Sequence, residues 1–264
     1  MKEFKPIEKF HFNNIKNIIL VASGKGGVGK STVAVGIALS LAKKGYKTGL
    51  MDADLYGPSV PTLFNLQNER PVSEEKDGKT CIIPFIRAGI KIMSLGFFFN
   101  PEQAVIWRGP MVTNAVKQLM NDTEWGELDY LIIDTPPGTG DILITLVQQF
   151  PINGALIVTT PQLISLADVQ KSIDLFNSTN IRIPVLGIVE NMSWFTPTRH
   201  PDEKYFLFGK GGGESLSKQF NIPLLAQISI NENICNQCDS GQLDEMLLDD
   251  QINNSYDRLI KCLI

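Results

Sequence analysis

The stretch GKGGVGKS, residues 24–31, separates a β-branched run at 15–23 from a segment of helical periodicity at 31–45. Closely spaced glycines let backbone N–H groups wrap around phosphates, and the first turn of a helix adds a positive dipole there. In the pattern G-x-x-x-x-G-K-[ST], the lysine contacts the β- and γ-phosphates and the hydroxyl binds Mg²⁺. The turn therefore predicts a site for ATP. One further contact is expected from Asn191, at the end of a later strand. The expected contacts are Gly24, Lys25, Gly26, Gly27, Val28, Gly29, Lys30, Ser31, Thr32 and Asn191.

The rest of the chain alternates apolar strands with helical segments. Strands that are apolar on both sides and separated by helices favour an α/β fold, with a mostly parallel sheet flanked by helices on both faces. We expect one domain over residues 1–264, with a short N-terminal extension at 1–14 and no separate N-terminal domain. The expected strands are 15–23, 46–54, 128–137, 153–161, 183–191 and 222–230, with an edge hairpin from 80–86 and 90–99. The expected helices are 31–45, 101–122, 163–178, 210–221 and 242–263, and 64–79 is expected to be a loop.

Carboxylates follow two of these strands. Asp134 follows four apolar residues, YLII (130–133), and opens DTPPGTGD, which is the usual place for a carboxylate that holds Mg²⁺ beside a phosphate loop. Asp52 and Asp54 end another strand in MDAD. We expect Asp54 to position the attacking water and Asp52 to support the metal, together with Ser31 and Asp134. Asn191 is expected at the adenine edge, and Thr32 at the α-phosphate.

Lys25 is not required by the phosphate-loop pattern. Lys30 already serves the phosphates of its own chain, so Lys25 needs a second role. A cation beside a phosphate site can act across a dimer, as an arginine finger does, if two subunits face each other over their nucleotides. The expected catalytic residues are therefore Lys25, Lys30 and Asp54, in a homodimer.

With Lys25 near its start, this turn resembles the deviant phosphate loop of the MinD/ParA class. That class includes the nitrogenase iron protein, the arsenical-pump ATPases and the Mrp carriers. Five longer segments look like the Mrp family of iron–sulfur carrier ATPases, over about residues 15–240. They are DADLYGPSVPTLF (52–64), WRGPMV (107–112), WGELDYLIIDTPPGTGD (125–141), VENMSWF (189–195) and FGKGGG (208–213). The resemblance implies a slow ATPase that carries an iron–sulfur cluster between two subunits and passes it to apoproteins, with assembly factors as further partners.

The cysteines depart from the family pattern. Many Mrp members carry a C-x-x-C pair soon after the ENMS segment, but residues 194–209 hold no cysteine and only His200 as a soft ligand. A different C-x-x-C, Cys235 and Cys238, lies in NICNQCDSG, which we expect to be a loop. Two such pairs in a dimer would supply four thiolates, enough for a bridging 4Fe–4S cluster. Cys81 and Cys262 are expected to be buried side chains.

Composition limits the other partners. The chain has 264 residues, a net charge of −4 and no basic tract, so nucleic acid is not expected. No apolar run reaches the ~18–20 residues that a membrane helix needs, and the first residues lack a secretory signal. We therefore expect a cytoplasmic protein without membrane contact, whose four cysteines stay reduced.

Other members of the class remain as alternatives. A MinD/ParA-like dimerisation switch without a cluster would share the nucleotide site, and the cysteine-free segment at 194–209 keeps this alternative open. A MinD-like protein would end in a basic membrane helix. Residues 242–263 instead carry five acidic and two basic residues, so we expect them to pack on their own domain. An electron-transfer iron protein like that of nitrogenase fits neither the long motifs nor the cysteine placement.

Overall fold

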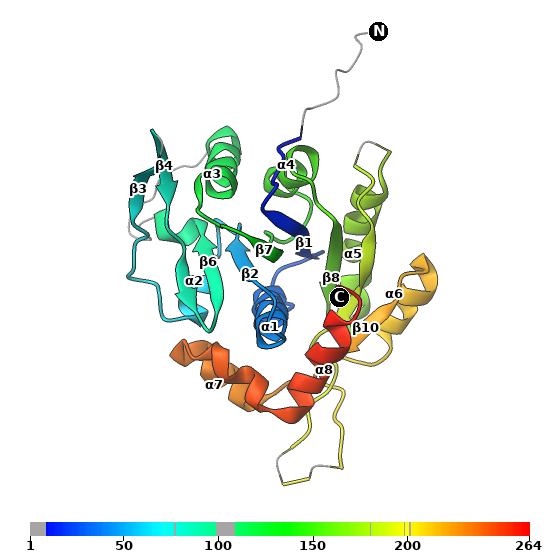
Figure 1. Cartoon of the computed structure of the whole chain (residues 1–264). Coiled ribbons are helices and arrows are strands. Elements are labelled where there is room, and N and C mark those ends of the chain that lie inside the picture. The colour runs from blue at the N-terminus through cyan, green and yellow to red at the C-terminus, as the bar shows by residue number, and fades with distance from the viewer. Residues whose placement is uncertain (1–8, 77, 99–108, 180, 198, 201) are drawn as a thin grey trace.

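The computed structural model describes residues 9–76, 78–98, 109–179, 181–197, 199–200 and 202–264 (Figure 1). Within these residues, eight strands form one sheet in the order β10-β9-β8-β1-β7-β2-β6-β5. Every neighbouring pair is parallel except β5 with β6. The strands are β1 Ile15–Ser23, β2 Thr48–Asp52, β5 Phe85–Arg87, β6 Ile90–Ser94, β7 Leu128–Asp134, β8 Gly154–Thr159, β9 Val185–Glu190 and β10 Leu224–Gln227.

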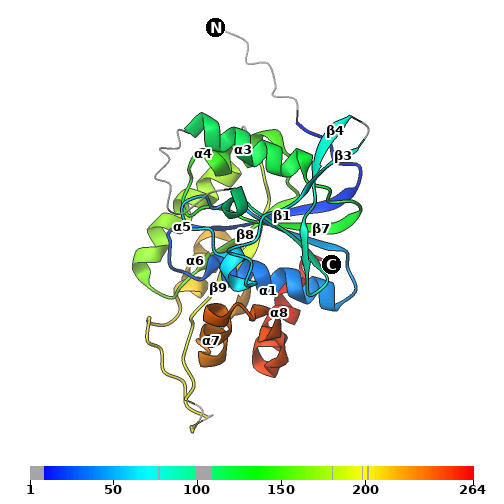
Figure 2. The same ribbon diagram turned by 90° about the vertical axis from the view of Figure 1, so that its left-hand side faces the viewer.

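Helices cover both faces of this sheet, so the expected fold class is confirmed. In Figures 1 and 2, α3 and α4 lie on one face, and α1, α7 and α8 lie on the other. The central strands β1, β7 and β8 are apolar on both sides and almost wholly buried, as parallel strands between two helical layers must be. The helices are α1 Lys30–Lys43, α2 Val60–Leu63, α3 Gly109–Asp122, α4 Asp141–Gln149, α5 Leu163–Asn177, α6 Gly212–Phe220, α7 Glu232–Ser240 and α8 Asp250–Ile260, with 3₁₀ turns η1 Leu95–Phe98 and η2 Leu243–Leu248.

Three local expectations need correction. Part of the expected loop at 64–79 is strand β3 (Ser73–Lys76), which pairs antiparallel with β4 (Lys79–Ile82) in a separate two-stranded sheet. The expected final helix, 242–263, is divided into η2 and α8, because the Asp249 side chain accepts the N–H groups of Gln251 and Ile252 and starts a new helix. The expected edge hairpin, 80–86 with 90–99, is present only in part as β5 with β6, because the first residues of its first strand belong to β4 of the separate sheet.

The cysteines also differ from expectation. The segment with Cys235 and Cys238 is helix α7, not a loop. The Asn231 side chain caps its first turn, and Gly241 ends it in the left-handed conformation, φ 70°. Cys81 is only partly buried and Cys262 is exposed, so neither is the buried side chain that was expected. Of the expected helix at 101–122, the part at 101–108 lies outside the described residues, as do Trp107 and Arg108 of the WRGPMV segment.

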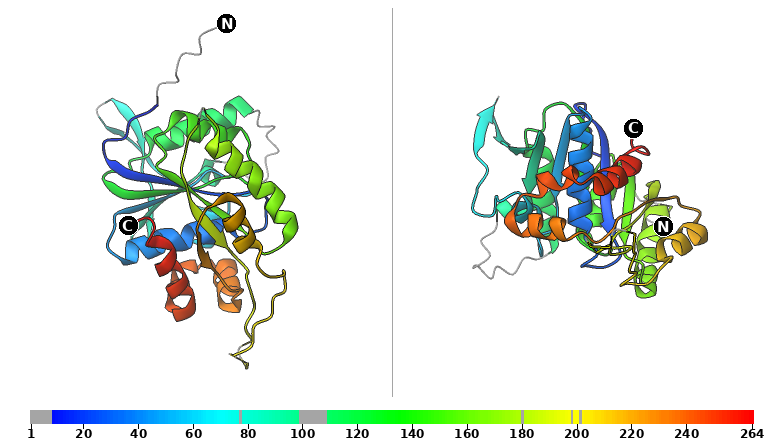
Figure 3. Two further views of the ribbon diagram at one scale, coloured as in Figure 1. Left: turned by 90° about the vertical axis from the view of Figure 1, so that its right-hand side faces the viewer. Right: turned by 90° about the horizontal axis from the view of Figure 1, so that it is seen from below.

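The C-terminal helix packs on its own domain, as its composition predicts. The buried face of α8 consists of Ile252, Tyr256, Leu259 and Ile260, and α8 lies against α1 (Figure 3). Gly36 is the position in α1 that permits this approach, because a Cβ atom there would lie 2.2 Å from Tyr256 Cζ and 2.6 Å from Met246 Cε. Within the described residues, no helix combines the length and apolar character required to cross a membrane.

This packing gives a first prediction. Replacing Gly36 by Ala would favour the isolated helix, but in the fold the new methyl group collides with the buried Tyr256 ring. We expect Gly36→Ala to lower the free energy of unfolding by about 1–3 kcal/mol, as overpacked cores do, in a urea titration. Gly140→Ala is the control, because no heavy atom lies within 4 Å of its added Cβ. Equal stability of the two variants would contradict the close packing of α1 on α8.

Candidate nucleotide site

The loop at 24–29 joins β1 to α1 at the carboxyl end of the sheet. Gly27 and Gly29 have φ angles of 78° and 77°, which favour glycine, so the loop turns tightly into the helix. A Cβ on Gly24 would lie 2.4 Å from the backbone carbon of Asp168, so only glycine lets α5 approach here. Both features suit the phosphate cradle that the sequence predicts. The loop, Asp54, Pro137 and Cys238 line a cavity of about 340 Å³.

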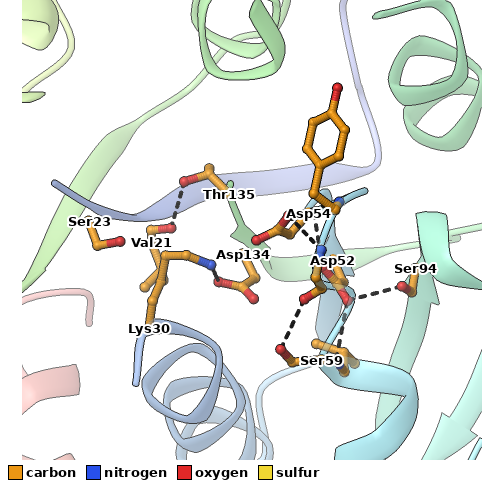
Figure 4. Close-up of polar contacts among 12 residues, drawn as sticks. Val21, Ser23, Lys30, Asp52, Asp54, Ser59, Ser94, Asp134 and Thr135 are labelled. Carbon is orange, nitrogen blue, oxygen red and sulfur yellow. Dashed lines mark hydrogen bonds and ion pairs between the residues drawn. The ribbon is translucent and has the colours of Figure 1, made fainter. Parts of the chain in front are cut away.

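Lys30 and Asp134 form a buried ion pair in this cradle (Figure 4). The Lys30 ammonium donates to Oδ1 of Asp134, and the two side chains are 7% and 0% exposed. Burial raises the pKa of Asp134, while the Lys30 charge and the Ser31 hydroxyl oppose that change. The predicted lysine and the predicted metal carboxylate are therefore brought together.

Asp52 lies opposite Asp134 in the pairing of β2 with β7. Its Oδ1 accepts the backbone N–H of Asp54 at 3.0 Å, and its Oδ2 accepts the N–H of Val60 at 3.2 Å and the Ser94 hydroxyl at 3.0 Å. Burial, and next the neighbouring Asp134 charge, raise the pKa of Asp52 to about 7. Asp52 thus orients the segment between β2 and α2. Ser94 was missed from the sequence, where its only signal is a polar residue that ends the apolar strand β6.

Asp54 points toward the cradle from the loop after β2 (Figure 4). Its Oδ1 accepts the N–H groups of Tyr56 and Gly57, both at 3.2 Å, and these bonds fix its orientation. Asp54 is 9% exposed and lines both the phosphate-loop cavity and a neighbouring cavity of about 480 Å³. This position suits a carboxylate that orients a water molecule.

The site has an unsatisfied acceptor that fits a cation. Oδ2 of Asp134 is buried and meets no hydrogen-bond donor among the described residues. A buried carboxylate oxygen without a partner is costly unless a cation or donor reaches it. Ser31 and Asp134 provide the hydroxyl and carboxylate oxygens that Mg²⁺ prefers. These residues therefore fit Mg²⁺, which would neutralise charge on the phosphate oxygens when bound.

Lys25 and Asn191 take positions that the pattern alone does not specify. Lys25 Nζ donates to Oε1 of Gln162 at 3.1 Å, at the start of α5, and so points away from the Lys30–Asp134 pair. Asn191 Nδ2 donates to the backbone carbonyl of Val28 at 2.9 Å. Asn191 therefore braces the phosphate loop, and its expected contact with adenine stays a prediction.

One of the two thiols of α7, that of Cys238, borders the same cavity. Cys238 is partly buried, and its Sγ lies 4.0 Å from Oγ1 of Thr32, while Cys235 is exposed. Burial, as the largest cause, raises the pKa of the Cys238 thiol. His200 does not join this pair of thiols. Its Nδ1 lies 3.7 Å from Oε1 of Glu203. In the described part of the chain, no group of three or more His, Cys, Asp or Glu is placed to hold a metal ion, so the pair needs ligands from elsewhere.

The buried ion pair gives a second prediction. Lys30→Ala leaves the Asp134 carboxyl buried without its cation, so we expect a loss of about 3 kcal/mol in the free energy of unfolding without nucleotide. The double variant Lys30→Met with Asp134→Asn removes both charges and should recover most of that loss. The control is Lys16→Ala, which breaks an exposed pair with Asp129 and should cost less than ~1 kcal/mol. Urea titrations measure all three, and a Lys30→Ala loss no larger than that of the control would contradict the burial of the pair.

Comparisons with known proteins agree with this geometry. The family described as ParA, NUBPL iron-transfer P-loop NTPase, matches residues 14–264. An iron-sulfur cluster carrier protein of Synechocystis sp. is 48% identical over 227 residues, which are 86% of this chain and 64% of that protein. One of Escherichia coli is 45% identical over 229 residues, 87% of this chain and 60% of that protein. The chain thus spans less than two thirds of the length of these relatives.

Solved structures show the same fold. A nucleotide-binding protein from Archaeoglobus fulgidus, in complex with ADP, is 36% identical with a TM-score of 0.78, over 92% of this chain and 93% of its own. The septum site-determining protein MinD from Pyrococcus horikoshii, complexed with Mg-ADP, has a TM-score of 0.63 over 94% of this chain and 96% of its own. At 18% identity, the latter supports the fold alone. The chain belongs to the ParA-type iron-transfer P-loop NTPases.

Proposed function

We propose that this chain is a slow ATPase that works as a homodimer and carries iron–sulfur clusters to apoproteins. The observation that carries the ATPase proposal is the convergence of Lys30, Asp134 and Asp54 on a glycine-bounded phosphate cradle. The ADP-bound relative from Archaeoglobus fulgidus supports nucleotide binding, and the relatives named iron-sulfur cluster carrier protein support the cargo.

The residues divide the work of hydrolysis as follows. Backbone N–H groups of the loop and the Lys30 ammonium bind the phosphates, and Lys30 then shifts from Asp134 toward the nucleotide. That shift frees the Asp134 carboxylate, which with Ser31 would hold Mg²⁺. Asp54, held by its two backbone N–H donors, orients a water molecule. The water oxygen attacks the γ-phosphorus, the bond to the bridging oxygen breaks, and the β-phosphate leaves on ADP.

Lys25 completes the site across the dimer in this proposal. In one subunit its ammonium is held by a single neutral acceptor, Gln162, and makes no ion pair within the described chain. A lysine held this weakly can move to a partner's phosphates at little cost, since one hydrogen bond to an amide is exchanged for charge-assisted bonds. A requirement for two subunits also explains why turnover would be slow.

The cargo site proposed here is Cys235 and Cys238 of both subunits, with four thiolates around one 4Fe–4S cluster. Two observations support it. Cys238 borders the phosphate-loop cavity, which faces the partner if Lys25 acts in trans. Residues three apart on a helix also lie on one side of it, so both thiols of α7 can face one cluster. Reduced cysteines and cluster transfer suit the cytoplasm, where thiols persist.

ATP hydrolysis tests the nucleotide part. Lys30→Ala should lose both ATP binding and turnover. Lys25→Ala should retain ATP binding and lose turnover on the order of 10³-fold, as when an arginine finger is removed. Asp54→Asn should retain ATP binding and lose roughly 10²-fold or more. Phosphate release and equilibrium binding of labelled ATP are measured for each, with Lys218→Ala, an exposed residue of α6, as control. Unchanged turnover in Lys30→Ala would contradict the nucleotide site.

Anaerobic reconstitution with iron and sulfide tests the cargo part. We expect about four irons per dimer and a thiolate-to-iron absorption band that is absent when Cys235 and Cys238 are both replaced by Ser. The exposed Cys262→Ser variant is the matched control and should bind iron normally. A cluster that survives the double variant would place the ligands elsewhere. Absence of any cluster in the unaltered protein would favour a MinD/ParA-like dimerisation switch that binds ATP without cargo.

A further inference from the structure

A second large cavity lies away from the nucleotide site. It has a volume of about 730 Å³ and opens between β10, α8 and the segment that follows β9. Figure 1 shows α8 beside β10, and the segment between β9 and α6 projects from the body nearby. The cavity shares no lining residue with the phosphate-loop cavity.

The cavity follows the edge of the sheet. Strand β10 is the last strand in the order and pairs only with β9. All four of its residues, 224–227, line the cavity. Successive side chains of a strand point to opposite faces, so a cavity that touches all four follows the strand's free edge. Among the described residues, nothing outside β9 bonds to the backbone of Leu224–Gln227. Such an edge can accept a further strand.

The charged groups of the cavity all have one sign. Lys204 and Arg258 line it, and no carboxylate does, although the whole chain has a net charge of −4. Both are exposed, and neither forms an ion pair within the described chain. The Lys204 ammonium lies 4.0 Å from the centroid of the Trp194 ring. Nε1 of Trp194, in the wall of the same cavity, is buried and has no hydrogen-bond acceptor among the described residues. The two cations and the indole N–H are therefore donors that have no hydrogen-bond acceptor among the described residues.

We propose that this groove binds an extended, acidic peptide segment of a partner protein, which adds to β10 as a ninth strand. The backbone of the segment would bond to the edge of β10, as in other strand-addition complexes. Its Asp or Glu side chains would pair with Arg258 and Lys204 and accept from the Trp194 indole. Two cations are too few to bind a nucleic acid backbone or an anionic membrane, which need larger basic surfaces.

The proposal is independent of the ATPase and of the cluster. It uses no residue of the phosphate loop and neither thiol of α7. A Lys30→Ala variant that fails to bind ATP should still bind the peptide, so failure of one proposal does not entail failure of the other.

Pools of biotinylated octapeptides test the groove. One pool has Glu at every second position and random β-branched or aromatic residues between, and matched pools have Gln or Lys in place of Glu. We expect the immobilised Glu pool to retain the full-length protein roughly tenfold better than the Gln pool, and the Lys pool to retain none. A peptide recovered from the Glu pool should change Trp fluorescence. Its copy with N-methylated alternate amides should fail to bind, because it cannot form the strand hydrogen bonds.

Variants locate the binding. Arg258→Glu and Lys204→Glu should each reduce retention at least tenfold. Lys261→Glu reverses an exposed charge just after α8, outside the cavity, and should have no effect. Circular dichroism and thermal unfolding confirm that each variant is folded. Equal retention of the three pools, an equal loss in Lys261→Glu, or full competition by free glutamate would each overturn the proposal, the last by showing a simple anion site.

Discussion

Burial of two carboxylates and one ammonium at the centre of the sheet constrains much of this molecule. Asp52 and Asp134 are opposite each other on neighbouring strands, and both are wholly buried. Burial, and next the neighbouring Asp134 charge, raise the pKa of Asp52 to about 7, and Asp134 is paired with Lys30. Lys30 can reach Asp134 only because the phosphate loop turns α1 over the end of β1. The loop, the sheet register and the charges therefore depend on one another.

Contacts lead outward from these carboxylates to the rest of the site. Asp52 accepts the N–H of Val60 and so fixes the start of α2. Helix α2 packs on α7, and α7 places Cys238 beside Thr32 in the first turn of α1. The phosphate loop and the thiols are thus connected both through α2 and by direct contact. The connection consists of packing contacts. It couples nucleotide binding to the thiols energetically if α1, α2 and α7 have two arrangements and the nucleotide favours one of them.

The sequence predicted those features that are local. The phosphate loop, its lysine and Asp134 follow from short patterns between a strand and a helix, and the parallel sheet follows from doubly apolar strands. Contacts between distant segments were not predictable. Neither the bond from Ser94 to Asp52 nor that from Asn191 to Val28 has a pattern in the chain. Helix α7 was missed because Asn, Cys, Asp and Ser are weak helix formers, and its caps, Asn231 and Gly241, decide its ends.

The position of the thiols has a consequence for the proposed carrier. Ligation of iron requires thiolates, and the half-burial of Cys238 against α1 raises its pKa and so favours the neutral thiol. A movement of α7 that exposes Cys238 to water would remove the burial that is the largest cause of its raised pKa. This outweighs the loss of the Thr32 hydroxyl contact and favours the thiolate. A nucleotide that contacts Thr32 acts on that same boundary. Coupling between two binding sites is reciprocal. If the nucleotide changes the affinity for a cluster at α7 by some factor, the cluster must change the affinity for the nucleotide by the same factor. In this arrangement, the nucleotide bound to a subunit would control loading and release of the cluster at the thiols of that same subunit, in addition to any control across the dimer.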